Sequence, residues 1–146
     1  PREKMSIHLL NLTTRQLSEV PGSKGLWSPR WSPDGRYIAA TATDFSTLYI
    51  THWKNPRWRQ IAGMFNIDHA AWSADSRYIY FDGRDEAGQR DLFRVSIPQG
   101  KLDRLADLRK FVMPDEHWFG VARDGAPLAL QATSVKEIWA MKYVLP

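Results

Sequence analysis

The stretch that decides the fold is Trp31-Ser32-Pro33-Asp34-Gly35-Arg36-Tyr37-Ile38-Ala39-Ala40, which recurs as Trp72-Ser73-Ala74-Asp75-Ser76-Arg77-Tyr78-Ile79-Tyr80-Phe81. A more divergent third copy is Val121-Ala122-Arg123-Asp124-Gly125-Ala126-Pro127-Leu128-Ala129-Leu130. The aspartates of the three copies, at positions 34, 75 and 124, lie 41 and 49 residues apart. A period of about 40–45 residues is typical of a four-stranded propeller blade. A polar insertion over residues 107–116 accounts for the longer second period.

Each period contains short segments rich in Ile, Val, Tyr, Trp and Thr, bounded by turn residues, which predicts strands. The predicted strands of the first two periods are residues 29–32, 37–43, 47–53, 58–62, 69–73, 78–82, 91–97 and 101–106. Those of the third are 118–122, 127–133 and 137–144, and segments 7–12 and 16–20 match the last two strands of a preceding unit. The second strand of each period is apolar on both faces, so we expect cover on both sides, as in stacked blades.

The repeated stretch has a structural interpretation. Trp31 and Trp72 are expected to be buried where the first strand leaves the middle of the blade. Asp34 and Gly35 are expected to turn the first strand back into the second, because Asp accepts a backbone hydrogen bond and Gly tolerates positive φ. Ser76 replaces this glycine in the second copy, which predicts a slightly strained turn.

The motif Trp-Ser-Pro-Asp-Gly-Arg-Tyr-Ile-Ala resembles the repeat of TolB-type (WD-like) β-propellers, and the resemblance extends from about residue 7 to residue 143. It implies the fold and does not specify an activity. The same repeat occurs in TolB itself, in the propellers of prolyl-oligopeptidase-like peptidases, and in sensor or interaction modules of bacterial regulators and kinases. The ending over residues 126–141 resembles the final blade of the regulator-type chains.

We therefore predict an all-β propeller segment of four-stranded antiparallel blades, with two complete blades and partial first and last blades. The expected boundaries are a blade remnant over 5–22, blades over 27–63 and 68–107, and an incomplete last blade over 117–146. Closing a ring takes four to eight blades. We expect this segment either to be the C-terminal part of a longer propeller or to associate with other copies, rather than to be a monodisperse monomer.

Composition narrows the classes of function. The net charge of +4 comes from basic residues scattered among acidic ones, so nucleic-acid binding by this segment is not expected. The absence of cysteine excludes disulfides and thiolate metal sites. No apolar run approaches the ~18 residues of a membrane span. The first residues lack the apolar core of a signal peptide and the initiator Met, which suggests a cut end.

Candidate site residues come from one end of the predicted blades. The loops between the second and third strands, 44–46 and 83–89, emerge there together with the start of each first strand and the 107–116 insertion. Rigid scaffolds usually bind through such loops. The residues expected to contact a ligand or partner are Asp44, Phe45, His69, Arg84, Asp85 and His117.

Other chemistry is not expected. His69 and His117 lack a third ligand or repeated carboxylate, so we predict polar rim residues rather than a metal site. No Gly-x-Ser-x-Gly elbow and no glycine-rich phosphate loop occurs in the sequence, so we predict neither catalysis nor a cofactor. The alternation of Trp and basic residues over 53–59 resembles a base-stacking surface but is better explained as an outer hairpin around Asn55-Pro56.

The expected function is a non-catalytic binding scaffold, a sensor or protein-interaction module of a larger bacterial signalling or regulatory protein that binds a protein or small ligand at the loop end. Two alternatives remain open. One is the propeller of a prolyl-oligopeptidase-like peptidase, which gates access to a catalytic domain. The other is a TolB-like periplasmic envelope protein. An extracytoplasmic location is slightly favoured over a cytoplasmic one.

Overall fold

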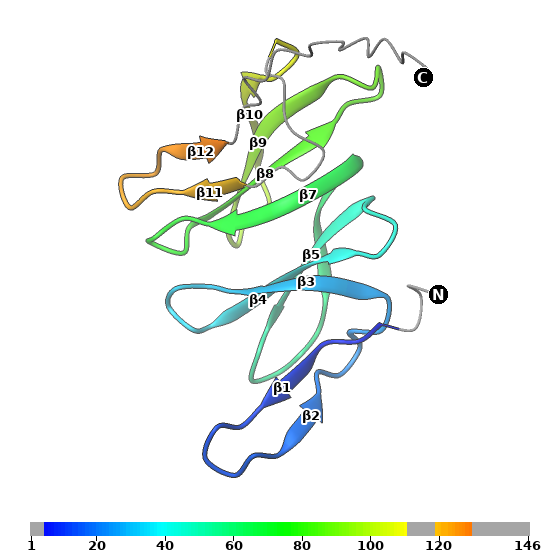
Figure 1. The fold of residues 1–146 in the computed structure, drawn as a ribbon, viewed down its shortest axis with the longest axis vertical. Coiled ribbons are helices and arrows are strands. Elements are labelled where there is room, and N and C mark those ends of the chain that lie inside the picture. Colours follow the sequence, from blue (N-terminus) through cyan, green and yellow to red (C-terminus); the bar gives the residue numbers. More distant parts are fainter. Residues whose placement is uncertain (1–4, 111–118, 130–146) are drawn as a thin grey trace, which may run out of the picture.

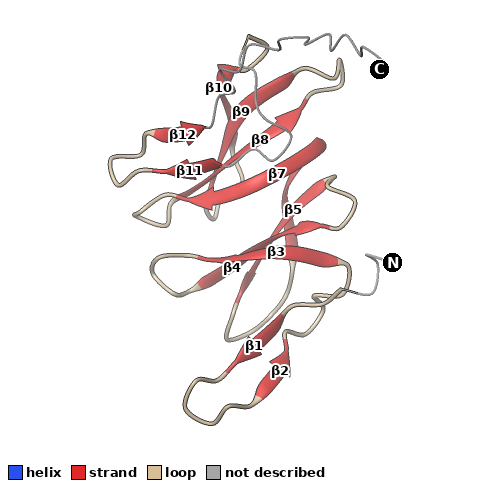
Figure 2. Cartoon of the chain, in the orientation of Figure 1, coloured by secondary structure: helices blue, strands red, loops and turns tan. Residues whose placement is uncertain are grey.

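The computed structural model describes residues 5–110 and 119–129 of the chain. Within these residues every regular element is a β-strand and no helix is present (Figure 2). The strands form antiparallel sheets that follow one another along the long axis of the molecule (Figure 1). The predicted all-β propeller architecture is therefore confirmed.

The centre of the molecule is made of two four-stranded meanders. The first runs in the order β3 (Leu26–Trp31), β4 (Tyr37–Ala42), β5 (Thr47–His52) and β6 (Arg59–Gly63). The second has the same order with β7 (Phe65–Trp72), β8 (Tyr78–Arg84), β9 (Arg90–Ser96) and β10 (Leu102–Asp107). Consecutive strands lie side by side in each sheet, which is the arrangement expected of a propeller blade.

The first strand of each sheet begins earlier than predicted. β3 starts at Leu26 rather than at Pro29, and its pairing with β4 shifts register between Trp27 and Arg30. Ser28 has a φ of 50° within this irregularity, and Asn66 has a φ of 52° in β7. A bulge lets a strand continue past residues that do not pair with the neighbouring strand. For this reason β3 and β7 begin before the residues at which the sequence pattern predicts their starts.

The turns of the repeated stretch form as predicted. Ser32 Oγ donates to Asp34 Oδ1 over 2.6 Å, and the same carboxylate oxygen accepts the N–H of Arg36 at 3.0 Å. Gly35 has a φ of 69°. Ser76, the counterpart of this glycine, has a φ of 61°, which is an uncommon conformation for a residue with a side chain. Asp34 and Asp75 are thus turn-forming residues.

The two meanders stack face to face on an apolar core. Ile38, Ala39 and Ala40 of β4 are all buried, as are Ile79, Tyr80 and Phe81 of β8. The predicted cover on both faces of the second strand is therefore confirmed for these two sheets, whereas Leu128 in the third copy is 55% exposed. The core between the sheets combines, among others, Ala39, Leu48, Ile50, Ile67, Ile79, Phe81 and Val95. We call this interface the first seam.

Partial sheets flank the two meanders. At the N-terminal side β1 (His8–Leu10) pairs with β2 (Leu17–Glu19), and Ile7 and Val20 pack on Leu26, Ile38 and Ala40. At the other side β11 (Phe119–Val121) pairs with β12 (Pro127–Ala129). Tyr80 and Leu92 form the small buried cluster there, with Leu108 and Val121 packed against it. We call this interface the second seam. The strand predicted over 137–144 lies outside the described residues.

One prediction about the core is wrong. Trp31 is 47% exposed and contacts Trp53 edge to face, with the ring centroids 5.9 Å apart. Its counterpart Trp72 is half-buried, and its indole N–H donates to the carbonyl of Arg30 across the first seam at 3.1 Å. The side chain of Trp72 is covered because a complete sheet precedes it. The sheet before the first meander has only β1 and β2 among the described residues, so Trp31 has no inner strand there to bridge to as Trp72 does.

Candidate binding site at the loop end

The β4–β5 turn is rigid because its own side chains bind its backbone. Asp44 is exposed, and its Oδ1 accepts the Ser46 hydroxyl at 2.7 Å and the Ser46 N–H at 3.0 Å. These hydrogen bonds hold the pKa of the Asp44 carboxyl below its usual value. Phe45, at the tip, has a φ of 63°, and its carbonyl accepts the N–H of Ile67 at 2.7 Å. The turn is thereby fixed to the beginning of the next sheet.

An apolar pocket lies beside this turn. The ring of Phe45 meets the indole of Trp27 edge to face, with centroids 5.0 Å apart. Together with Met5 and Thr43, these two residues line a pocket of about 160 Å³. The indole nitrogen of Trp27 is buried and has no hydrogen-bond partner within the part of the chain that the structure describes. A buried donor without an acceptor costs free energy.

The β8–β9 loop is closed by two of the predicted site residues. Asp85 Oδ1 accepts the N–H of Gln89 at 2.8 Å, and the guanidinium of Arg84 donates to the carbonyl of Gly88 at 2.8 Å. Both side chains are half-buried, whereas Glu86 and Ala87 at the tip are exposed. Arg84 and Asp85 therefore shape the loop in this structure.

The predicted site residues do not all come together in the described structure. Phe45 lines the apolar pocket, Asp44 precedes it in the same turn, and Arg84 and Asp85 lie in the corresponding loop of the next sheet. The side chain of His69 and the whole of His117 lie outside the described residues, so their placement on the rim stays a prediction. The sequence pattern does not indicate Trp27 as a site residue, because the predicted strand over 29–32 begins after it.

Sequence reasoning also missed a set of ion pairs in the second meander. Asp91 is buried and makes a bidentate pair with Arg104, at 2.6 and 2.8 Å. The buried Asp82 lies 3.2 Å from Arg90, measured from Oδ2 to Nε. Arg109 binds Asp107 and lowers the pKa of that carboxyl to about 2. The sequence places acidic and basic residues on neighbouring strands. Which of them form pairs can be predicted only once the strand register is known.

Neither a metal-binding cluster nor a membrane-spanning helix is found in the described part of the chain. No group of three or more His, Asp or Glu side chains in residues 5–110 and 119–129 is arranged to hold a metal ion. The same residues contain no helix with the length and apolar character required to cross a membrane.

Comparisons with known proteins point to one fold. No protein-family model matches the chain. Dipeptidyl-peptidase 5 of Porphyromonas gingivalis is 24% identical over 157 residues, which covers 86% of this chain and 22% of that protein. The chain thus spans about a fifth of the length of the curated relative that it matches.

Solved structures agree with this fold. TolB from Agrobacterium tumefaciens superposes with a TM-score of 0.67 at 20% identity, covering 91% of this chain and 48% of that one. TolB from Acinetobacter baumannii gives 0.66 at 17% identity, covering 84% and 31%. The propeller domain of the trilobed protease from Pyrococcus furiosus gives 0.60 at 18% identity, covering 78% and 36%. The chain is therefore a β-propeller segment with the fold shared by TolB proteins and peptidase propeller domains, as its repeat predicts.

Proposed function

We propose that this chain is a non-catalytic binding scaffold, a protein-interaction or sensor module within a larger regulatory or signalling protein. The observations that carry this proposal are the pocket of about 160 Å³ at the loop end, lined by Trp27 and Phe45, and the buried indole N–H of Trp27, which has no acceptor within the described residues. An apolar side chain followed by a backbone carbonyl supplies both the apolar contact and the missing acceptor. The occupant that fits is therefore a short apolar segment of a partner protein.

A nuclear magnetic resonance titration with N-acetyl-leucinamide tests this proposal on the full chain. The indole N–H signal of Trp27 is expected to shift saturably as the probe is added, because the indole N–H then donates a hydrogen bond to a carbonyl of the probe. Trp27→Phe removes the donor and keeps an aromatic ring, and it should weaken binding about tenfold. Lys54→Ala is the control, since Lys54 is exposed on the β5–β6 turn and does not line the pocket.

Two results would refute the proposed pocket. One is an indole signal that does not respond to the probe. The other is binding that Trp27→Phe and Phe45→Ala leave unchanged.

A second candidate function is the propeller of a peptidase, and the similarity to dipeptidyl-peptidase 5 favours it. In that case the chain would gate or position peptides for a catalytic domain elsewhere in the protein. Hydrolysis of chromogenic dipeptide substrates by the complete natural protein would support this function over a regulatory one. A TolB-like envelope role, with a periplasmic location, is the third alternative. Export of the natural protein to the periplasm, measured by cell fractionation, would support it.

A further inference from the structure

The second seam contains a pocket at the end of the molecule opposite the loop site. Its volume is about 220 Å³, and it lies between the β7–β8 turn and the β11–β12 turn. Figure 1 shows these two turns beside each other at the left of the molecule. The residues that matter for its chemistry are Asp75, Tyr78, Tyr80, Arg123, Asp124 and Gly125.

This pocket exists because one side chain of the repeat is missing. At the first seam the N–H of Asp34 donates to the hydroxyl of Ser76 in the next sheet at 3.0 Å. The residue equivalent to Ser76 at the second seam is Gly125, which has a φ of 87° and no side chain. Asp75, the counterpart of Asp34, therefore cannot make the same hydrogen bond. A Cβ at position 125 would lie 3.7 Å from the hydroxyl of Tyr80, which shows that a side chain there would occupy the pocket.

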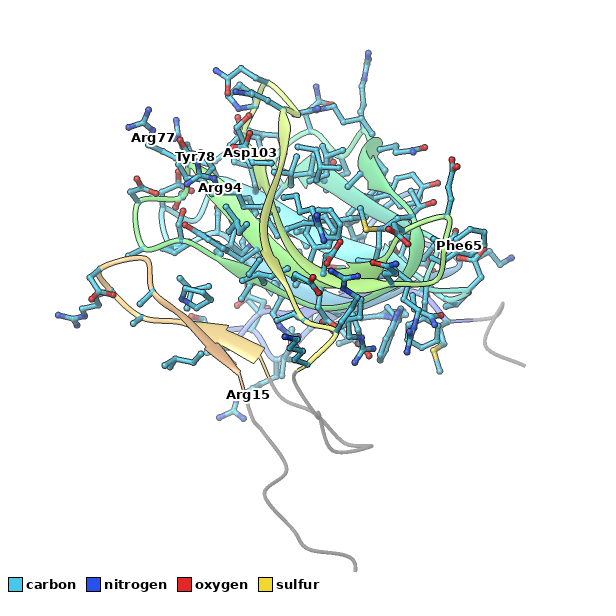
Figure 3. The ribbon with its side chains drawn as sticks, turned by 90° about the horizontal axis from the view of Figure 1, so that it is seen from above. Arg15, Phe65, Arg77, Tyr78, Arg94 and Asp103 are labelled. Carbon is cyan, nitrogen blue, oxygen red and sulfur yellow. The ribbon has the colours of Figure 1, made fainter. Side chains whose placement is uncertain are left out.

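Tyr80 supplies a buried donor to this pocket. Its side chain is 6% exposed, and it lies directly opposite Arg94 on the neighbouring strand. The guanidinium of Arg94 is stacked on Tyr78 at 4.6 Å and pairs with Asp103 at 3.2 Å (Figure 3). The hydroxyl of Tyr80 lies beside Gly125 in the lining of the pocket. A hydroxyl donates one hydrogen bond, so Tyr80 offers its proton to an acceptor in the pocket.

The two carboxylates of the pocket supply acceptors. Asp75 Oδ1 accepts the Ser73 hydroxyl at 2.7 Å and the Arg77 N–H at 3.0 Å. These bonds lower the pKa of Asp75, so the group is ionised at neutral pH. Asp124 Oδ1 accepts the N–H of Ala126 at 3.0 Å. In each carboxylate the second oxygen is not used by these bonds and is available to a ligand.

We propose that the second seam binds a neutral polyhydroxylated ligand of the size of one sugar ring, held by Tyr80, Arg123 and the carboxylates of Asp75 and Asp124. An anion would face two carboxylates, and a cation would face Arg123. An ammonium group of a zwitterion needs three acceptors, whereas each carboxylate has one oxygen left. A hydroxyl both donates and accepts, so it fits a mixed set of donors and acceptors without a net charge. This site is independent of the function proposed above.

The test is a titration of the isotope-labelled full chain, followed by amide chemical shifts. The probes are glucose, galactose and myo-inositol, with glycine and inorganic phosphate as charged comparators. We expect at least one of the three polyols to shift the amide signals of Asp75 and Gly125 saturably at millimolar concentration. Tyr80→Phe removes only the hydroxyl and should weaken binding about tenfold. Gly125→Ser should abolish it by filling the pocket.

The matched control is Gly35→Ser, which places the same residue in the equivalent turn of the first sheet. Gly35 also has a positive φ, and a Cβ there meets no atom within 4 Å. This variant should bind the polyol as the wild-type chain does. The proposal fails if none of the three polyols binds saturably, if Tyr80→Phe binds with unchanged affinity, or if glycine or phosphate binds at these residues in preference. Retained amide dispersion in each variant shows that the fold is intact.

Discussion

The two seams occupy equivalent places in the repeat and have opposite chemistry. Strand register pairs Ala39 with Ile50 on the face of the first meander that packs into the first seam. The same register pairs Tyr80 with Arg94 on the face of the second meander that looks into the second seam. The first seam is thus closed by apolar packing, and the second retains polar groups and a pocket. A repeat determines where the strands lie. The residues at facing positions determine whether the interface between two sheets is filled by apolar side chains or retains a pocket.

The outer strands show the same contrast. Asp91 opposes Gly83 and Arg104 opposes Phe93 in the second meander. The corresponding positions of the first meander hold Thr47 and Gln60, which are uncharged. The ion pairs are therefore a property of the second meander and are not a requirement of the repeat. The second meander has an apolar face toward the first seam. Its loop end carries ion pairs, and its opposite face, toward the second seam, carries polar groups.

The largest expected loss in the free energy of unfolding comes from a substitution in the apolar first seam. Phe81 is fully buried in the first seam and stacks on Phe93, with ring centroids 5.9 Å apart. Phe81→Ala should destabilise the chain by about 3–5 kcal/mol, because it removes a large buried ring and leaves a cavity. Urea unfolding followed by circular dichroism measures this loss. Tyr80→Phe, on the opposite face of the same strand, is the control and should cost about 1 kcal/mol or less. Equal losses would contradict the contrast between the seams.

The next effect compares two tryptophans at one repeat position. Trp72→Ala should cost about 2–3 kcal/mol, since the half-buried indole also bridges the first seam through its bond to the Arg30 carbonyl. Trp31→Ala should cost less than about 1 kcal/mol, because much of its indole is in water. The measurement is the same urea transition. A larger loss of stability for Trp31→Ala than for Trp72→Ala would contradict the exposure of Trp31. It would mean that the surface around Trp31 is covered in solution, for example by a second copy of the chain.

A smaller effect is expected at the turn that crosses the first seam. Ser76→Gly relieves the positive φ of Ser76 but removes the acceptor of the Asp34 N–H. The two contributions oppose each other and should cancel to within about 1 kcal/mol. Urea unfolding gives the net change, and the amide shift of Asp34 reports the lost bond. A destabilisation of about 2 kcal/mol or more would mean that the hydrogen bond across the seam dominates.

The smallest effect concerns the carboxyl of Asp75. Its pKa is lowered first by the Ser73 hydroxyl and then by the Arg77 N–H. A carboxyl whose folded pKa lies below its unfolded value stabilises the fold above the unfolded pKa, and this contribution is lost as the pH falls through the folded pKa. Ser73→Ala should therefore raise the pKa of Asp75 toward 3.8 and reduce the dependence of stability on pH below about 4. Carbon-detected titration of the Asp75 carboxyl measures the shift, and an unchanged midpoint would contradict the assigned cause.

Several features could be predicted from local chemistry alone. The Asp34 and Asp75 turns follow from Asp-Gly and Asp-Ser next to short apolar strands, because a side-chain carboxylate and a positive φ act within a few residues. The stacking of sheets follows from the doubly apolar second strand. The starts of β3 and β7 could not be predicted, because bulges at Ser28 and Asn66 depend on pairing with a partner strand.

The candidate site was only partly predictable. Phe45 lies in the turn that the sequence indicates, but the pocket that it lines also needs Met5 and Trp27, which come from other parts of the chain. The sequence predicts Arg84 and Asp85 as contact residues because they are polar loop residues, and their hydrogen bonds to Gly88 and Gln89 show that such residues also close a loop. A sequence does not distinguish these uses, since both place polar groups near a tip.

The sequence by itself determined the repeat, its period and the turn at each copy, because these depend on neighbours within a few residues. Only the tertiary structure decided how each copy is used. Trp31 and Trp72 share a motif, yet one is exposed and the other crosses a seam, because burial depends on which sheet lies opposite. Ser76 and Gly125 share a position, yet the first seals a seam and the second opens a pocket. Packing between sheets sets these outcomes, and it joins residues more than 40 positions apart in the chain.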